Sequence, residues 1–196
     1  MKRLATFLIL SLLTGCGTYT PKTIPDTLLK PTKQYSGNLG IVNVTVRENV
    51  KITVYPFHTP IPTDDPNISG KPVSTGPVGI EIRTYLKDAV TNSLEAYNLF
   101  DKIGPIRYLM TAIIERYEIF GMMRGTERAM SVQFELINLK NGKIVFSDSI
   151  NSHIRYRSFE GGRKLLTKTE EKLILDIVTQ LINSLHNNLK DKKIIR

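Results

Sequence analysis

The chain has very little cysteine and histidine, the residues that build disulfide frameworks, many metal centres and thiol-based active sites. Its 196 residues include one cysteine, no tryptophan and three histidines. A single cysteine excludes any disulfide within the chain, so an ordinary hydrophobic core must stabilise the fold. The histidines, His58, His153 and His186, are far apart in the sequence and lack the spacing of metal ligands. The composition therefore predicts neither a metal site nor a cofactor.

The chain also lacks a hydrophobic run of the roughly 20 residues that a membrane-spanning helix requires. Its clearest apolar stretch covers residues 4–13, directly after Lys2 and Arg3. A short apolar run after a positively charged start is typical of a secretory signal peptide. We therefore assign residues 1–15 to a signal peptide and expect export from the cytoplasm.

The only cysteine stands directly after this segment. The sequence Leu13-Thr14-Gly15-Cys16 resembles the lipobox of bacterial lipoproteins. The resemblance implies a diacylglycerol on the Cys16 thiol, cleavage before Cys16 and acylation of the new N-terminus. An ordinary signal peptide with a chance cysteine is the alternative. Each buried acyl CH₂ contributes about 0.8 kcal/mol, so three chains would hold the protein at a membrane permanently.

The resemblance also implies a location. In lipoproteins of this type, Gly17 rather than Asp after the lipidated cysteine usually accompanies sorting to the outer membrane. We therefore expect the domain to be lipid-anchored at the outer membrane and to face the periplasm.

Positive charge predominates. The formal net charge is +9, and removal of Lys2 and Arg3 leaves +7. A basic surface favours anionic partners. Nucleic acid does not fit an exported and tethered chain, whereas anionic phospholipid or lipopolysaccharide does. A solvated basic surface without a specific partner is the alternative. The candidate anion-binding residues near the end of the last predicted strand are Arg155, Arg157, Arg163 and Lys164.

Proline content divides the chain. Residues 16–38 carry three prolines and no helix or strand periodicity, which predicts a lipidated N-terminus followed by an extended tether. Residues 39–190 form one predicted domain, and 191–196 form a basic tail. Within the domain, residues 56–79 contain six prolines and three glycines. We expect this segment to be a long, exposed, mobile loop that folding does not require.

Hydrophobic periodicity predicts the elements of the domain. The expected order is strands near 39–46 and 51–55, a helix over 80–99, strands over 108–120, 129–139 and 143–157, and a helix from 167. Two helices with three consecutive antiparallel strands predict an α+β fold: a two-layer sandwich of a mostly antiparallel sheet with both helices on one face.

Three local signals refine this prediction. The strand over 108–120 carries apolar residues on both faces and should be central. Asn141-Gly142 predicts a tight hairpin turn, because both residues tolerate positive φ. Thr167 and Glu170 have the spacing of a capping box at the start of the last helix.

No catalytic motif is present. The sequence lacks a Gly-x-Ser-x-Gly elbow, a complete phosphate loop and the ligand pattern of a calcium-binding EF-hand. We therefore predict a protein that is not an enzyme.

A wider resemblance covers about residues 80–188. It rests on Leu86-Lys87-Asp88-Ala89-Val90, Asn98-Leu99-Phe100, Tyr108-Leu109-Met110-Thr111-Ala112 and the Asn-Gly hairpin. These resemble YajG-type lipoproteins and the auxiliary lipoproteins of ABC-type envelope transporters, and the element order is more weakly similar to LptE. The resemblance implies an accessory component of an envelope assembly or transport system with a protein partner. Direct binding of an anionic glycolipid, as in lipopolysaccharide handling, is the alternative.

Overall fold

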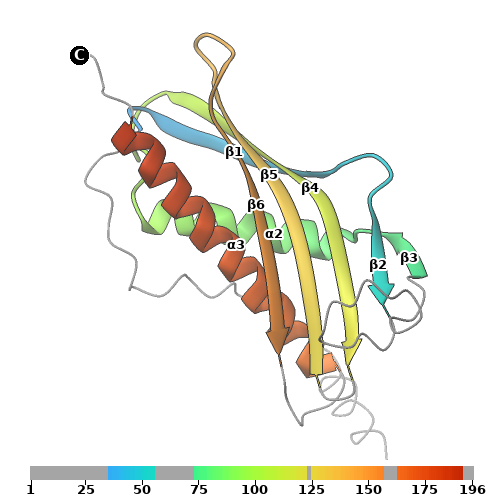
Figure 1. The fold of residues 1–196 in the computed structure, drawn as a ribbon. Helices are drawn as coiled ribbons and strands as arrows, with labels where there is room; N and C mark the ends of the chain where they lie inside the picture. The colour runs from blue at the N-terminus through green and yellow to red at the C-terminus, as the bar shows by residue number, and fades with distance from the viewer. Residues whose placement is uncertain (1–34, 56–72, 123–124, 157–162, 192–196) are drawn as a thin grey trace, which may run out of the picture.

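A computed structural model describes residues 35–55, 73–122, 125–156 and 163–191. The elements in chain order are strands β1 (Asn38–Val46), β2 (Lys51–Tyr55) and β3 (Val73–Pro77), helix α2 (Ile80–Ala96), strands β4 (Ile106–Met122), β5 (Gly125–Asn138) and β6 (Lys143–Tyr156), and helix α3 (Arg163–Asp191). All six strands join one sheet, and both helices cover the same face of it (Figure 1). The predicted α+β sandwich with a mostly antiparallel sheet is confirmed.

Strand β4 is the centre of the sheet, as its two apolar faces predicted. One edge pairs antiparallel with β5 over the whole length of β4. The other edge pairs in parallel with β1 over its first half and with β2 over its second half. Because β1 and β4 run in parallel, both begin at the same end of the molecule. This end also holds the β5–β6 hairpin (Figure 1).

The core lies between the sheet and the two helices. Leu86, Val90 and Leu94 of α2 follow a helical spacing and are almost fully buried. In α3 the buried stripe is Leu173, Ile174, Ile177, Val178, Leu181, Ile182 and Leu185. Each fully buried aliphatic side chain stabilises the fold by roughly 1.5–3 kcal/mol, so packing holds both helices on the sheet.

The other sheet face is open to solvent. Ser147, Ser149 and Asn151 of β6 are exposed on it. Asp148 differs, because its carboxylate accepts a hydrogen bond from the Ser184 hydroxyl of α3. The alternation of side chains along β6 therefore places Asp148 on the helix side.

Two boundaries differ from the prediction. Residues 73–77 of the predicted loop form β3, which pairs antiparallel with β2. Pro77 is tolerated because β3 is an edge strand, where a missing N–H donor costs little; residues 56–72 lie outside the described part. Helix α3 begins at Arg163, before the predicted capping box, and good helix formers occupy 164–166.

Two details of the strand block go beyond the sequence pattern. A register shift between Ile114 and Arg116 moves Tyr117 to the helix face, where it is 1% exposed. The hairpin stands where Asn141-Gly142 predicted it, but Asn138 pairs with Lys143 and only Gly142 has a positive φ, of 66°. The loop is therefore four residues long, closed by a Gly142 N–H bond to the Asn138 carbonyl at 2.8 Å.

Candidate functional site

Tyr35 is the first described residue and is held firmly by the core. Its ring stacks on Phe100 with centroids 5.1 Å apart and meets Tyr108 edge-on at 5.6 Å. Its hydroxyl donates to Asn188 Oδ1 of α3 at 3.1 Å, and its N–H donates to the Leu99 carbonyl at 2.8 Å. Burial raises the pKa of the Tyr35 hydroxyl above its ordinary value, and neighbouring Tyr108 adds to the effect. The packed domain thus begins before the predicted boundary at residue 39.

The turn that follows α2 binds the residues directly after Tyr35. Asn98 adopts a positive φ of 51°, which ends the helix. Gly37 N–H donates to Asp101 Oδ2 at 2.6 Å, and Asp101 N–H donates to the Gly37 carbonyl at 3.2 Å. This reciprocal pair ties the entry of β1 to the turn.

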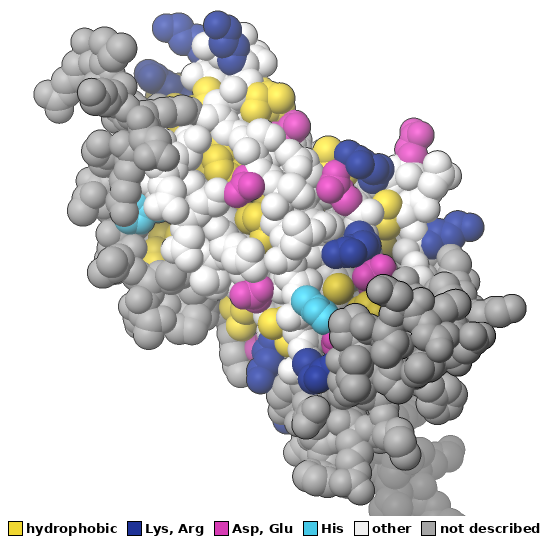
Figure 2. Space-filling view, viewed as in Figure 1, with side chains coloured by type: hydrophobic (Ala, Val, Ile, Leu, Met, Phe, Trp, Pro, Cys, Tyr) yellow, Lys and Arg dark blue, Asp and Glu magenta, His cyan; other side chains and the backbone are white. Residues whose placement is uncertain are grey.

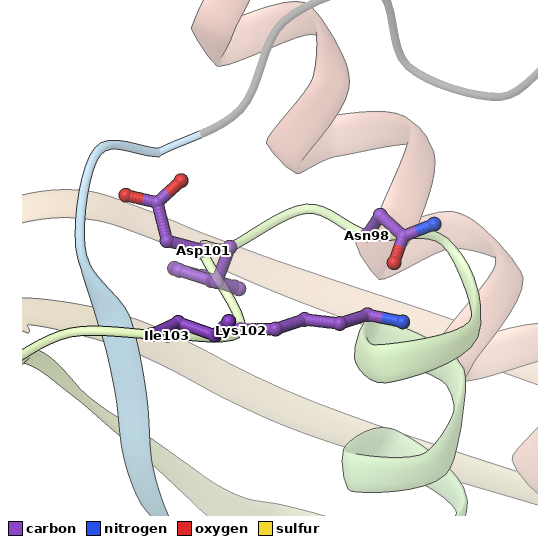
Figure 3. Close-up of a pocket in the computed structure, with 5 residues that line it drawn as sticks. Asn98, Asp101, Lys102 and Ile103 are labelled. Atoms are coloured by element: carbon purple, nitrogen blue, oxygen red, sulfur yellow. The ribbon is translucent and has the colours of Figure 1, made fainter.

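A shallow hollow of about 350 Å³ lies at this turn (Figure 3). Its lining residues are Asn98, Phe100, Asp101, Lys102 and Ile103. Lys102 extends across the hollow toward Asn98, whereas Asp101 points toward the start of β1 (Figure 3). The hollow therefore offers an amine and an amide as hydrogen-bonding groups, but no nucleophile beside a general base.

Four exposed cations lie around the same end of the molecule. Tyr108 pairs with Asn138, and the Leu139 N–H donates to the Arg107 carbonyl at 2.8 Å, which brings the hairpin beside the start of β4. The cations are Lys102, Arg107, Lys140 and Lys143. Within the described residues none of them forms an ion pair.

Exposed hydrophobic side chains accompany these cations. Six large hydrophobic residues of the described part are exposed, and five of them belong to this end: Ile41 (69%), Ile103 (92%), Ile106 (59%), Leu139 (51%) and Ile144 (54%). We call these five residues and the four cations the basic end. Figure 2 shows Lys and Arg side chains gathered at the top of the molecule, with hydrophobic side chains beside them.

The opposite end of the sheet carries a second charged group, centred on Glu127. The Glu127 side chain is only 3% exposed; its carboxylate contacts His153 Nε2 and forms an ion pair with the Arg155 guanidinium at 2.9 Å. Arg155, one of the four candidate anion-binding residues, therefore already has a carboxylate partner. Arg157 and the side chains of Arg163 and Lys164 lie outside the described residues, so that prediction stays open.

A buried polar network joins β4, β5 and α3 on the helix side of the sheet. The Tyr117 hydroxyl donates to Glu170 Oε1 at 2.9 Å and accepts a hydrogen bond from Arg128 Nη1. Arg128 Nη1 also lies 3.0 Å from Glu170 Oε1. Burial is the main cause that raises the pKa of Tyr117 above its ordinary value. Sequence reasoning missed this network; the only signal was the charged pair Glu127-Arg128 within a strand.

The other residues singled out from the sequence do not converge. His186 of α3 is half-buried, far along the chain from His153, and His58 lies outside the described part. Within that part no three His, Cys, Asp or Glu side chains could hold a metal ion together. None of the described helices has the length and apolarity to cross a membrane. Cys16 and the lipobox residues Leu13, Thr14 and Gly15 precede the described residues.

Comparison with known proteins shows the fold. No family model and no curated protein sequence matches this chain. The crystal structure of XCC0632 from Xanthomonas campestris, described as a DUF330 protein, aligns with a TM-score of 0.57 at 15% identity, covering 86% of this chain and 93% of that one. The two proteins therefore share an architecture.

Bacterial lipoproteins are among the weaker structural matches. A candidate lipoprotein from Caulobacter crescentus aligns with a TM-score of 0.46 at 16% identity, covering 59% of this chain and 88% of that one. Lipoprotein GNA1162 from Neisseria meningitidis has a TM-score of 0.26 at 16% identity, with 74% and 100% covered.

Proposed function

We propose that this chain is a bacterial envelope lipoprotein whose domain is held at a membrane by acyl chains on Cys16. One observation carries the proposal: the lipobox-like sequence ends at Cys16, and Tyr35, only 19 residues further along the chain, is already part of a packed domain. This arrangement suits a short tether between a lipid anchor and a folded domain.

The domain acts as a binding component rather than an enzyme. The hollow beside Asp101 lacks a nucleophile–base pair, and the buried Tyr117–Arg128–Glu170 network bridges the sheet to α3. The proposed role is that of an accessory protein in an envelope assembly or transport system at the outer membrane, facing the periplasm. Crosslinking from intact envelopes, followed by purification of this chain, would identify the protein partner.

Labelling with palmitate tests the anchor. The full precursor should incorporate labelled palmitate and fractionate with membranes, whereas Cys16→Ser should remain unlabelled. Thr18→Ser, a conservative change two residues away, serves as the matched control and should keep the label. Persistent labelling of the Cys16→Ser protein would contradict the proposal.

The sorting expectation has its own test. Gly17→Asp should move the labelled protein from outer-membrane to inner-membrane fractions on a density gradient, while its palmitate content stays the same. An unchanged distribution of the Gly17→Asp protein would refute outer-membrane sorting by this position.

The alternative role is direct binding of an anionic glycolipid at Arg155, Arg157, Arg163 and Lys164. Arg155 does not support it, because Glu127 already binds the Arg155 guanidinium. Titration with lipopolysaccharide at low and moderate salt tests it, since charge contacts are screened by salt. Binding that ignores both salt and neutralisation of these four residues would reject it.

A further inference from the structure

We propose that the basic end rests on an anionic phospholipid surface, with its exposed hydrophobic side chains entering the headgroup region. The inference deepens the proposed function, because a lipid anchor at Cys16 would keep the domain close to such a surface. It gives the domain a defined orientation on the membrane instead of free rotation about a tether.

Uncompensated charge is the first argument. The segments 98–107 and 138–144 contain Lys102, Arg107, Lys140 and Lys143 but a single carboxylate, Asp101. That carboxylate is partly buried and accepts the Gly37 N–H at 2.6 Å. A cluster in which four cations accompany one carboxylate is complementary to anionic lipid headgroups, which attract Lys and Arg close to the surface.

Exposed apolar area at the same place is the second argument. Ile103 is 92% exposed between Lys102 and Gly104, and Ile144 is 54% exposed directly after Lys143. Apolar side chains beside basic ones are the composition that binds the boundary between headgroups and acyl chains. The polar face of Ser147, Ser149 and Asn151 offers no such combination.

The path of the chain is the third argument. Tyr35, where the described chain begins, donates to Asn188 near the end of α3, so both ends of the described chain meet at the basic end. The 18 residues 17–34 reach at most about 60 Å when extended, which allows this end to touch a membrane that holds Cys16. The sequence after Leu189 adds four cations, at Lys190, Lys192, Lys193 and Arg196, and one carboxylate, at Asp191.

Vesicle binding tests the charge contribution without the anchor. The mature chain from residue 16 carrying Cys16→Ser should bind vesicles of phosphatidylglycerol and phosphatidylcholine, and should bind vesicles of phosphatidylcholine alone far more weakly. Removing Lys140 and Lys143 together, as Lys140→Gln and Lys143→Gln, should lower the affinity on the order of twentyfold, since each charge near an anionic surface contributes about fivefold. The matched control removes two exposed lysines elsewhere, by Lys51→Gln and Lys87→Gln, and should change the affinity less than about twofold.

A fluorescent label tests the contact itself. Because Cys16 is the only cysteine, Ile103→Cys in the Cys16→Ser chain gives a single labelling site. An environment-sensitive dye there should shift to the blue when anionic vesicles are added. The control is Ile80→Cys, since Ile80 is 70% exposed at the start of α2, away from the basic end; its dye should not shift.

Several outcomes would overturn the proposal. One is an equal loss of vesicle affinity from the two lysine pairs, and another is a dye at position 80 that shifts as much as one at position 103. A third is a dye shift at position 103 that appears without lipid as protein concentration rises, which would assign the surface to a second copy of the chain. Tighter binding to lipopolysaccharide micelles than to phosphatidylglycerol vesicles would assign it to a glycolipid instead. Because the assay uses an unlipidated chain, its failure is distinct from a failure of palmitate labelling at Cys16.

Discussion

Gly37 and Asp101 are 64 residues apart in sequence and exchange two hydrogen bonds, one from the Gly37 N–H to Asp101 Oδ2 and one from the Asp101 N–H to the Gly37 carbonyl. Gly37 has a φ of 123°, which side chains rarely adopt, and the Arg107 side chain lies against it. Gly37, the Asp101 carboxylate and the aliphatic part of the Arg107 side chain thus fix the point at which the chain enters the sheet.

Gly37→Ala should destabilise the protein more than Gly104→Ala. Both glycines have nearly the same φ, 123° and 127°, so both substitutions impose backbone strain of about 1–3 kcal/mol. A Cβ at Gly37 would also lie 2.5 Å from Arg107 Cδ, whereas nothing lies within 4 Å of one at Gly104. We expect a further loss of about 1–3 kcal/mol at Gly37 from this overlap. Urea denaturation would measure both; equal losses would show that Arg107 moves aside freely.

Tyr117 should make the protein sensitive to alkali. Burial raises the pKa of its hydroxyl above the ordinary 10.0, so its contribution to stability is present below about pH 10 and falls as the pH rises further. The free energy of unfolding should fall by up to about 1.4 kcal/mol per pH unit from this group. Tyr117→Phe should be less stable near neutral pH but lose less at high pH. Urea denaturation at a series of pH values would show this, and parallel curves for the two proteins would contradict it.

Arg128 and Glu170 should be strongly coupled. The Arg128 side chain is 6% exposed and that of Glu170 is 26% exposed, so Glu170→Leu leaves a buried cation without its carboxylate and should cost about 3–5 kcal/mol. The double variant Glu170→Leu with Arg128→Met should lose less free energy of unfolding than the two single variants lose together, by more than about 1 kcal/mol.

The matched control for this cycle is the pair Arg47–Glu115. Its atoms are 2.7 Å apart, but its side chains are 62% and 22% exposed. Its coupling in the same double-mutant cycle should stay below about 1 kcal/mol. Similar coupling energies for the two pairs would show that burial does not strengthen the Arg128–Glu170 contact.

Two deletions within residues 56–79 should distinguish the contribution of the connecting segment from that of β3. Removing residues 60–71 shortens a connection, and closure entropy changes only slowly with length, so the melting temperature should change little. Extending the deletion through residue 77 removes β3 and the hydrogen bonds it makes with β2, and should lower the melting temperature markedly. If the shorter deletion already unfolds the domain, residues 60–71 contribute packed structure.

Local sequence patterns were sufficient for the fold class and for every element of the described part except β3. The apolar stripes of α2 and α3, the alternation in β5 and β6 and the turn signal at Asn141-Gly142 each depend on residues close together in the chain. Such patterns report which face of an element is buried, and they predicted a two-layer α+β sandwich with β4 at its centre. The lipobox at Cys16 is likewise a local signal, and it carries the proposed anchoring.

Only the tertiary structure decided which distant residues meet. The parallel pairing of β1 and β2 on the same edge of β4, the placement of Tyr35 between Phe100 and Tyr108, and the turn of Tyr117 to the helix side arise from long-range strand register. Register depends on how whole surfaces pack, because a shift of one residue exchanges the two faces of a strand. The basic end is a product of this packing: its cations and hydrophobic residues come from β1, the turn after α2, the start of β4 and the β5–β6 hairpin, and no local pattern in the sequence links them.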